Sequence, residues 1–226
     1  MVAFLREPPC LVTRFIDARP VADDELRGPL LEEAAHALRA LHDAPGLPSV
    51  FDAFAVVEAY HATAIANGVA IPADYAGLAR AATSIRAALV GPEHGPVPCH
   101  NDYLTANFLH DGRRLRIVDW EYAGMGDRYF DLGNFAVNNG FGDDEDRTLL
   151  AAYWQQPVTP QRFACLKLMR IMSDFREGMW GVVQSGISTL DFDFAGYAEE
   201  HLTRVAAGLA DARVPTWLED ARGDQP

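Results

Sequence analysis

The segment from His100 to Asp131 constrains the fold of this 226-residue chain more than any other stretch. Two short runs within it, residues 107–110 and 115–119, flank the dipeptide Asp111-Gly112. An Asp-Gly pair tolerates the positive φ that a tight hairpin turn requires, so the pattern predicts two antiparallel strands. We therefore expect a small β-hairpin with polar residues gathered at one end.

Polar side chains stand where the strands of this hairpin begin and end. Asp102 precedes the first strand, Asn107 begins it, and Asp119 ends the second. Kinases use the spacing Asp-x-x-x-x-Asn, followed by an Asp after a strand, to place a base and two ligands for Mg²⁺. Each residue alone is compatible with a turn cap or a strand end. Together they predict a phosphoryl-transfer site, to which Glu121 adds a further oxygen ligand of the kind that Mg²⁺ prefers.

Four short motifs in the segment carry a family resemblance: His100-Asn101-Asp102, Asn107-Phe108-Leu109, Asp119-Trp120-Glu121-Tyr122-Ala123-Gly124 and Asp131-Leu132-Gly133-Asn134. They resemble the catalytic loops of the choline/ethanolamine kinase family, which belongs with the aminoglycoside phosphotransferases in the protein-kinase-like fold. The resemblance implies that ATP and Mg²⁺ are the cofactors. It also implies that His100 and Asp131 support the catalytic loop.

The same resemblance assigns roles to the polar residues around the hairpin. Asp102 would be the catalytic base, and Asn107 would act beside it. Asn107 and Asp119 would hold Mg²⁺, with help from Glu121.

The N-terminal stretch from Cys10 to Ile16 is β-branched and apolar and predicts one strand. In the resembled family this position is the hinge between two lobes, where the backbone near Arg14, Phe15 and Ile16 would bind adenine. An ordinary strand and turn fits the sequence equally well. We expect residues 1–20 to form a hinge strand and linker, and residues 21–226 to form a helical C-terminal lobe.

Helical spacing of apolar residues predicts most of the remaining structure. The expected helices cover residues 29–42, 49–65, 72–89, 129–139, 143–154, 159–184 and 193–213. Four acids at 143–146 should form a solvated helix start, and the tail after Pro215, apart from Trp217 and Leu218, should be frayed. We expect His42 at the surface or its boundary. The fold class is α+β, mostly helical: the C-terminal lobe of the protein-kinase-like fold with a small catalytic hairpin.

A cationic pocket is one interpretation of the aromatic residues near the end of the longest helix. By the family resemblance, Trp180, Tyr122 and Tyr197 would surround the cation of the substrate through cation–π attraction, and Asn134 would contact it. Glu177 would balance its charge. The alternative is a plain aromatic core in which Glu177 pairs with Arg176 or Arg170, and the sequence leaves both open.

The charge and the cysteine content limit the kinds of partner and compartment that fit this chain. The net charge is −13, which disfavours a nucleic-acid partner and is compatible with a small cationic amino-alcohol substrate. Three widely spaced cysteines form no CxxC pair and fit a reducing compartment. The first ten residues lack a signal-peptide pattern and no stretch is long enough to span a membrane, so we expect a cytoplasmic protein.

An N-terminal lobe with a glycine-rich loop and a strand lysine is expected in this fold, but the only lysine is Lys167 and about twenty residues precede the first helix. We therefore expect a chain from a truncated gene or a lobe-deleted protein, with a homodimer covering the exposed surface. The chain could be a choline or ethanolamine kinase, a catalytically weak, pseudokinase-like cation-binding module, or an aminoglycoside-type phosphotransferase.

Overall fold

The computed structural model describes residues 2–223. Helices dominate, and the strands are short. The elements in chain order are β1 (Ala3–Arg6), β2 (Pro9–Val12), β3 (Arg19–Pro20), α1 (Asp23–Arg27), α2 (Leu31–His42), α3 (Ala53–Ala66), α4 (Tyr75–Ala88), β4 (Val97–Cys99), β5 (Phe108–His110), β6 (Leu115–Ile117), β7 (Gly124–Gly126), α5 (Arg128–Asn138), α6 (Asp143–Trp154), α7 (Pro160–Ile187), α8 (Phe194–Leu209) and α9 (Val214–Arg222).

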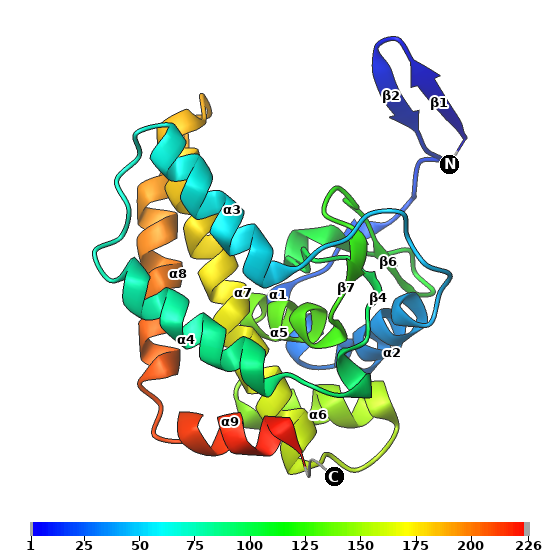
Figure 1. The fold of residues 1–226 in the computed structure, drawn as a ribbon. Coiled ribbons are helices and arrows are strands. Elements are labelled where there is room, and N and C mark those ends of the chain that lie inside the picture. The colour runs from blue at the N-terminus through cyan, green and yellow to red at the C-terminus, as the bar shows by residue number, and fades with distance from the viewer. Residues whose placement is uncertain (1, 224–226) are drawn as a thin grey trace.

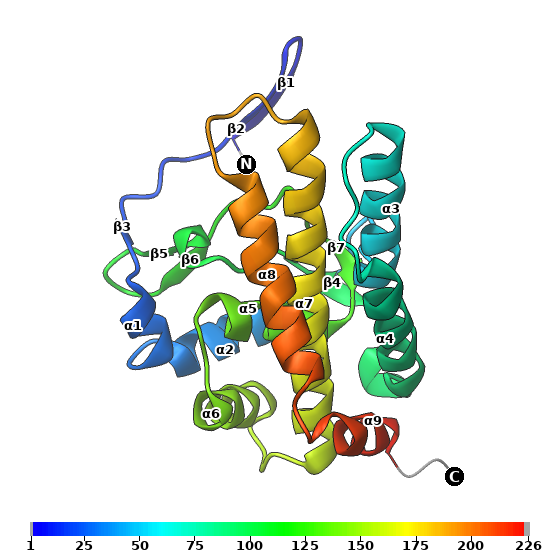
Figure 2. The same cartoon turned by 90° about the vertical axis from the view of Figure 1, so that its left-hand side faces the viewer.

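Helix α7 forms the centre of the molecule. It begins at Thr159, whose hydroxyl accepts a hydrogen bond from the backbone N–H of Arg162 at 3.2 Å, and at Pro160, which suits a first helical position. Helices α3, α5, α8 and α9 pack around it (Figures 1 and 2). This burial on nearly all sides explains the almost continuous apolar sequence of α7 and confirms the mostly helical α+β fold. Within residues 2–223, none of the helices combines the length and the apolar character needed to cross a bilayer.

The expected hairpin is present as β5 and β6. The two strands are antiparallel, with Phe108 opposite Ile117 and His110 opposite Leu115, and Gly112 in the turn has a φ of 83°. Strand β3 extends this small sheet along β5. A separate pair, β4 and β7, leads into the loop that carries Asp102.

The N-terminal strand differs from the expectation. The predicted strand from Cys10 to Ile16 ends at Val12, where it pairs with β1 in a hairpin that projects from the helical body (Figure 1). Residues 13–18 have no regular structure. Phe4, Leu11 and Phe15 are exposed in this region, and the homodimer expected to cover such a surface stays a prediction.

Two helix boundaries were predicted wrongly. Helix α3 begins at Ala53 and not at residue 49, because the Asp52 carboxylate caps it by accepting hydrogen bonds from the backbone N–H groups of Phe54 and Ala55. The Ser49 hydroxyl instead donates to the carbonyl of Ala123 at 2.6 Å. The tail after Pro215, expected to be frayed apart from Trp217 and Leu218, is helical as far as Arg222, because it forms α9, which packs on α7 and buries Trp217.

The acidic start of α6 is only partly solvated, contrary to the expectation from the sequence. The Asp146 side chain is fully buried and accepts hydrogen bonds from Lys167 at 2.9 Å and from Arg170. Asp143 also pairs with Lys167 and with Arg213. Two cations from α7 thus neutralise a carboxylate whose burial would otherwise be costly.

Candidate active site

Asp102 and Asn107 are in direct contact at the base of the β5–β6 hairpin. The Asn107 side-chain nitrogen donates to the Asp102 carbonyl at 2.8 Å and to the Asp102 carboxylate at 3.2 Å. The Asn107 carbonyl accepts a hydrogen bond from the Val118 nitrogen at 3.0 Å, which brings the end of β6 beside it. Because Asp102 takes the amide nitrogen, the amide oxygen of Asn107 is the atom left for a ligand.

Asp119 follows Val118 directly, so it stands beside the Asn107 loop as expected. Its backbone has a φ of 63°, in the left-handed region that only a few non-glycine residue types adopt readily. Its side chain is exposed, as is that of Glu121. Oxygen atoms of Asn107 and Asp119 are the hard ligands that suit Mg²⁺, so the residues present fit this ion.

A buried carboxylate holds the loop that carries Asp102. Asp131 at the start of α5 accepts hydrogen bonds from the backbone nitrogens of His100 at 2.9 Å and Asn101 at 2.7 Å. The Nε2 atom of His42 lies 3.0 Å from the same carboxylate. His42 is therefore buried, contrary to the surface position expected from the sequence, because it has a polar partner on α5.

His100 links this loop to the hairpin. Its Nε2–H donates to the carbonyl of Val118 at 2.9 Å, and its ring lies between Tyr103 and Trp120, each with a centroid distance of 4.8 Å. His100 therefore fixes the segment before Asp102 relative to the segment before Asp119.

The described residues contain one compact group of three metal-ligating side chains, namely His42, Cys99 and Asp131, all buried. Burial and the neighbouring carboxylates raise the pKa of the Cys99 thiol, so the thiol stays protonated. The Asp131 oxygens are already occupied by the catalytic loop. This group serves packing and loop support.

Asn134 was expected to contact the substrate. The structure places it fully buried, with its oxygen accepting from the Tyr103 nitrogen at 2.5 Å and its nitrogen donating to the Ser173 hydroxyl at 3.0 Å. Both ends of the amide are bonded within the protein. This geometry favours a positioning role, in which Asn134 ties the loop after Asp102 to α7.

Three residues on α7 and α8 were expected to bind the amine of the substrate, and they lie together: Glu177, Trp180 and Tyr197. The Tyr197 hydroxyl donates to the Glu177 carboxylate at 3.0 Å, and the rings of Trp180 and Tyr197 meet edge to face with centroids 5.6 Å apart. Glu177 is buried and also pairs with Arg176. The pairing with Arg176 is the one expected from the plain-core alternative, yet it occurs beside the candidate base.

Arg176 was expected only as a possible partner of Glu177, and its position beside Asp102 was not predicted. Its Nη1 atom lies 3.7 Å from the Asp102 carboxylate, and its guanidinium lies 4.4 Å from the centroid of the Tyr122 ring. Its charge also acts on Tyr60 of α3, which lies close by. The available signal was an ion pair of adjacent residues, Arg176 and Glu177, in a helix otherwise too apolar to face water.

The local charges set the protonation of the site. Burial raises the pKa of Asp102, the Arg176 guanidinium opposes that shift, and Glu177 adds to it. Burial also raises the pKa of Tyr122 to about 12. Asp102 is therefore a carboxylate that takes up a proton more readily than a solvent-exposed aspartate does.

The residues expected to bind adenine lie at the surface beside the hairpin turn. Arg14, Phe15 and Ile16 line a cavity of about 600 Å³ together with the hairpin residues Asp111, Arg113 and Arg116. Phe15 is 88% exposed. Their role in nucleotide binding stays a prediction.

Comparison with known proteins identifies the family. A family model described as a phosphotransferase enzyme family matches residues 4–166, which is most of the chain. The chain belongs to this phosphotransferase family. A choline/ethanolamine kinase family protein from Mesorhizobium loti has a similar structure, with a TM-score of 0.83 and 29% identity over 92% of this chain and 72% of that chain.

Within the phosphotransferase family, the relatives are choline and ethanolamine kinases. Human ethanolamine kinase 2 is 31% identical over 120 residues, which cover 44% of this chain and 31% of the human protein. Choline kinase LicA from Streptococcus pneumoniae, at 24% identity and a TM-score of 0.72 over 87% of this chain and 69% of that chain, shares the fold. The chain spans about a third of the length of the curated ethanolamine kinases that it matches.

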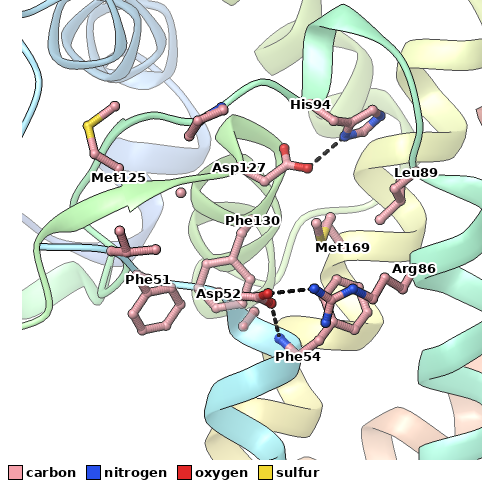
Figure 3. Close-up of a pocket in the computed structure, with 14 residues that line it drawn as sticks. Phe51, Asp52, Phe54, Arg86, Leu89, His94, Met125, Asp127, Phe130 and Met169 are labelled. Atoms are coloured by element: carbon pink, nitrogen blue, oxygen red, sulfur yellow. Dashed lines mark hydrogen bonds and ion pairs between the residues drawn. The ribbon is translucent and has the colours of Figure 1, made fainter.

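A second cavity of this phosphotransferase-family chain is lined by residues of α3, α4, β7, α5 and α7 (Figure 3). It measures about 260 Å³ and is bounded by two polar pairs, Asp52 with Arg86 at 2.7 Å and His94 with Asp127 at 2.6 Å. The Cys165 sulfur lies 3.5 Å from the other nitrogen of His94. Burial raises the pKa of this thiol, so the set lacks the thiolate that a nucleophile requires.

Proposed function

We propose that this chain is the acceptor-binding part of an ATP- and Mg²⁺-dependent phosphotransferase that phosphorylates the hydroxyl group of ethanolamine, choline or a related amino alcohol. The observation that carries the proposal is the contact between Asn107 and Asp102, next to the strand end that presents Asp119. This arrangement combines a carboxylate for the acceptor hydroxyl with two oxygen ligands for the metal. The family and its choline and ethanolamine kinase relatives support the same chemistry.

In this proposal Asp102 accepts the proton of the acceptor hydroxyl as the oxygen attacks phosphorus. Its carboxylate is kept in place by Asn107, and its charged form is favoured by Arg176. His100 and Asp131 hold the loop rigid, which maintains the base within reach of the hydroxyl. When bound through Asn107 and Asp119, Mg²⁺ would neutralise charge on the transferring phosphoryl group.

The nucleotide assignment rests on the family and on a structural neighbour. LicA has a structure in complex with AMP, and that protein shares the fold at a TM-score of 0.68 and 23% identity over 86% of this chain and 68% of that chain. We place the adenine near Arg14, Phe15 and Ile16 and the phosphates toward Asp119. Mg²⁺, ATP and the cytoplasmic location remain part of the proposal.

A second candidate is a cation-binding module with little catalytic activity. One observation favours it: the single lysine of the chain, Lys167, pairs with Asp143 and Asp146 on α6 and does not face the hairpin. This chain therefore offers no lysine for nucleotide phosphates at the candidate site.

A phosphorylation assay distinguishes these functions. The chain is incubated with Mg·ATP and, in separate reactions, with ethanolamine, choline or an aminoglycoside, and the phosphorylated product is detected by mass spectrometry. Phosphoethanolamine or phosphocholine that disappears in Asp102→Asn supports the kinase. Amine binding by calorimetry without product supports the module, and product from the aminoglycoside alone contradicts both.

A further inference from the structure

The candidate acceptor site contains a cation that belongs to the protein. Arg176 is 1% exposed, and its guanidinium lies 4.4 Å from the centroid of the Tyr122 ring and 5.9 Å from that of Phe51. It pairs with Glu177 and lies 3.7 Å from the carboxylate of Asp102. The guanidinium therefore uses one aromatic face and part of two carboxylates at the place where an amine substrate would bind.

The guanidinium is incompletely bonded. Its Nε and Nη2 atoms are buried and have no hydrogen-bond partner among the described residues. A buried donor without a partner is unfavourable, so the contacts with Glu177 and with the Tyr122 ring are what keep the guanidinium at this place.

The net charge of this cluster favours binding of one more cation, and the available contacts favour a particular type. Arg176 carries one positive charge against the two carboxylates of Asp102 and Glu177, so the cluster is one negative charge in excess. A primary ammonium can donate hydrogen bonds to these two carboxylates, whose oxygens can each accept more than one. A quaternary ammonium donates none and depends on aromatic faces, of which Arg176 already covers that of Tyr122.

We propose that Arg176 is a specificity-determining residue that makes this site select acceptors with a primary ammonium group over acceptors with a quaternary ammonium group. This inference rests on the proposed function and names the substrate class within it. Trp180 remains partly exposed, but its ring packs edge to face on Phe194 and Tyr197. These contacts occupy part of the aromatic surface that a trimethylammonium group would need.

Calorimetric titration with ethanolamine and with choline tests the inference. We expect the wild-type chain to bind ethanolamine more tightly than choline. In Arg176→Met the ratio of the two dissociation constants should shift toward choline by at least about tenfold, because the Tyr122 face and the second carboxylate are released. The matched control is Arg170→Met, six residues earlier on α7, which also loses an ion pair but should leave the ratio unchanged.

A second variant keeps the test valid if Arg176→Met does not fold. Arg176→Gln also removes the charge over the Tyr122 ring but keeps a polar group beside Glu177, and it should shift the ratio toward choline in the same direction. A wild-type chain that binds choline as tightly as ethanolamine, or a ratio that Arg176→Met leaves unchanged, overturns the inference. Phosphorylation of both amines with that unchanged ratio overturns the inference alone, whereas the absence of binding and of product for both amines overturns the proposed function as well.

Discussion

The Asp131 carboxylate lies 2.7 Å from the backbone nitrogen of Asn101, the residue that precedes the candidate base. Asn101 has a φ of 67°, and this left-handed conformation needs support from its surroundings. Asp131 provides it from the first turn of α5. The direction in which Asp102 points thus depends on a residue thirty positions later in the chain.

Replacement of Asp131 by alanine should strongly destabilise the fold. The backbone N–H groups of His100 and Asn101 would be buried without an acceptor, and we expect the free energy of unfolding to fall by about 3 kcal/mol or more. Urea denaturation followed by circular dichroism measures the change. The control is Asp144→Ala at an exposed position of α6, where a change below about 1 kcal/mol is expected. Equal effects of the two substitutions would contradict the role of Asp131.

Asp102→Asn should abolish phosphoryl transfer and leave the fold intact. The amide cannot accept the hydroxyl proton, so we expect kcat to fall by at least about 100-fold. Burial raises the pKa of Asp102, which means that the ionised carboxylate is unfavourable in the folded state at neutral pH. The melting temperature of Asp102→Asn should therefore equal or exceed that of the wild type. Wild-type turnover, or a clear loss of thermal stability, would count against the assignment.

The pH dependence of kcat/KM should report the ionisation of Asp102. Transfer needs ionised Asp102, so kcat/KM should rise with pH through its pKa, at a value above the ordinary 3.8. Because the Arg176 guanidinium lowers this pKa, Arg176→Met should move the rise to higher pH, and Arg170→Met should not move it. Steady-state rates at saturating nucleotide from about pH 4 to pH 8 measure the shift. A rise at the same pH in all three proteins would exclude control by Asp102 and Arg176.

Activity should rise with pH, but the contribution of Asp102 to folding stability should fall as the pH rises. The folded state binds the Asp102 proton more tightly than the unfolded chain does, so this group favours folding at low pH. Its contribution becomes unfavourable as pH rises through the raised pKa. The difference in melting temperature between Asp102→Asn and wild type should therefore increase from acidic to neutral pH.

Asp119 can be tested with a substitution that preserves its backbone. Asparagine accepts a φ of 63° more readily than alanine, so Asp119→Asn removes the charge and Asp119→Ala adds backbone strain. We expect both variants to weaken Mg·ATP binding in calorimetry by at least tenfold, or about 1.4 kcal/mol, and only the alanine variant to lower the melting temperature. Unchanged affinity in Asp119→Asn would remove this residue from the metal site.

Gly133→Ala should destabilise the protein, although replacing a helical glycine by alanine usually has the opposite effect. Glycine to alanine normally stabilises a helix by up to about 1 kcal/mol. A Cβ atom at Gly133 would lie 2.8 Å from the Met169 backbone carbon, so α5 and α7 would have to separate and the variant should be less stable than wild type. Gly77→Ala is the control, because a Cβ there meets only the exposed Asp74 side chain and should be neutral or stabilising. Thermal unfolding of the two variants shows whether the signs differ.

The sequence by itself determined the local structure and the order of the chemical groups. Asp111-Gly112 predicted the hairpin, because its turn conformation is a property of those two residues, and Gly112 has the positive φ expected. The Thr159-Pro160 start of α7 was also readable, since a cap needs only neighbours three residues apart. The spacing from Asp102 to Asn107 lies within one short loop, and the two residues do meet.

The tertiary structure alone decided which distant groups compensate one another. A carboxylate or guanidinium is buried only where a partner reaches it, and sequence spacing does not show that Asp146 meets Lys167 or that His42 meets Asp131. The same applies to Arg176, for which the sequence indicates only a position in a helix and a possible pairing with Glu177. Packing of α7 beside the catalytic loop places its charge next to both Asp102 and the Tyr122 ring, which no local spacing in the sequence indicates.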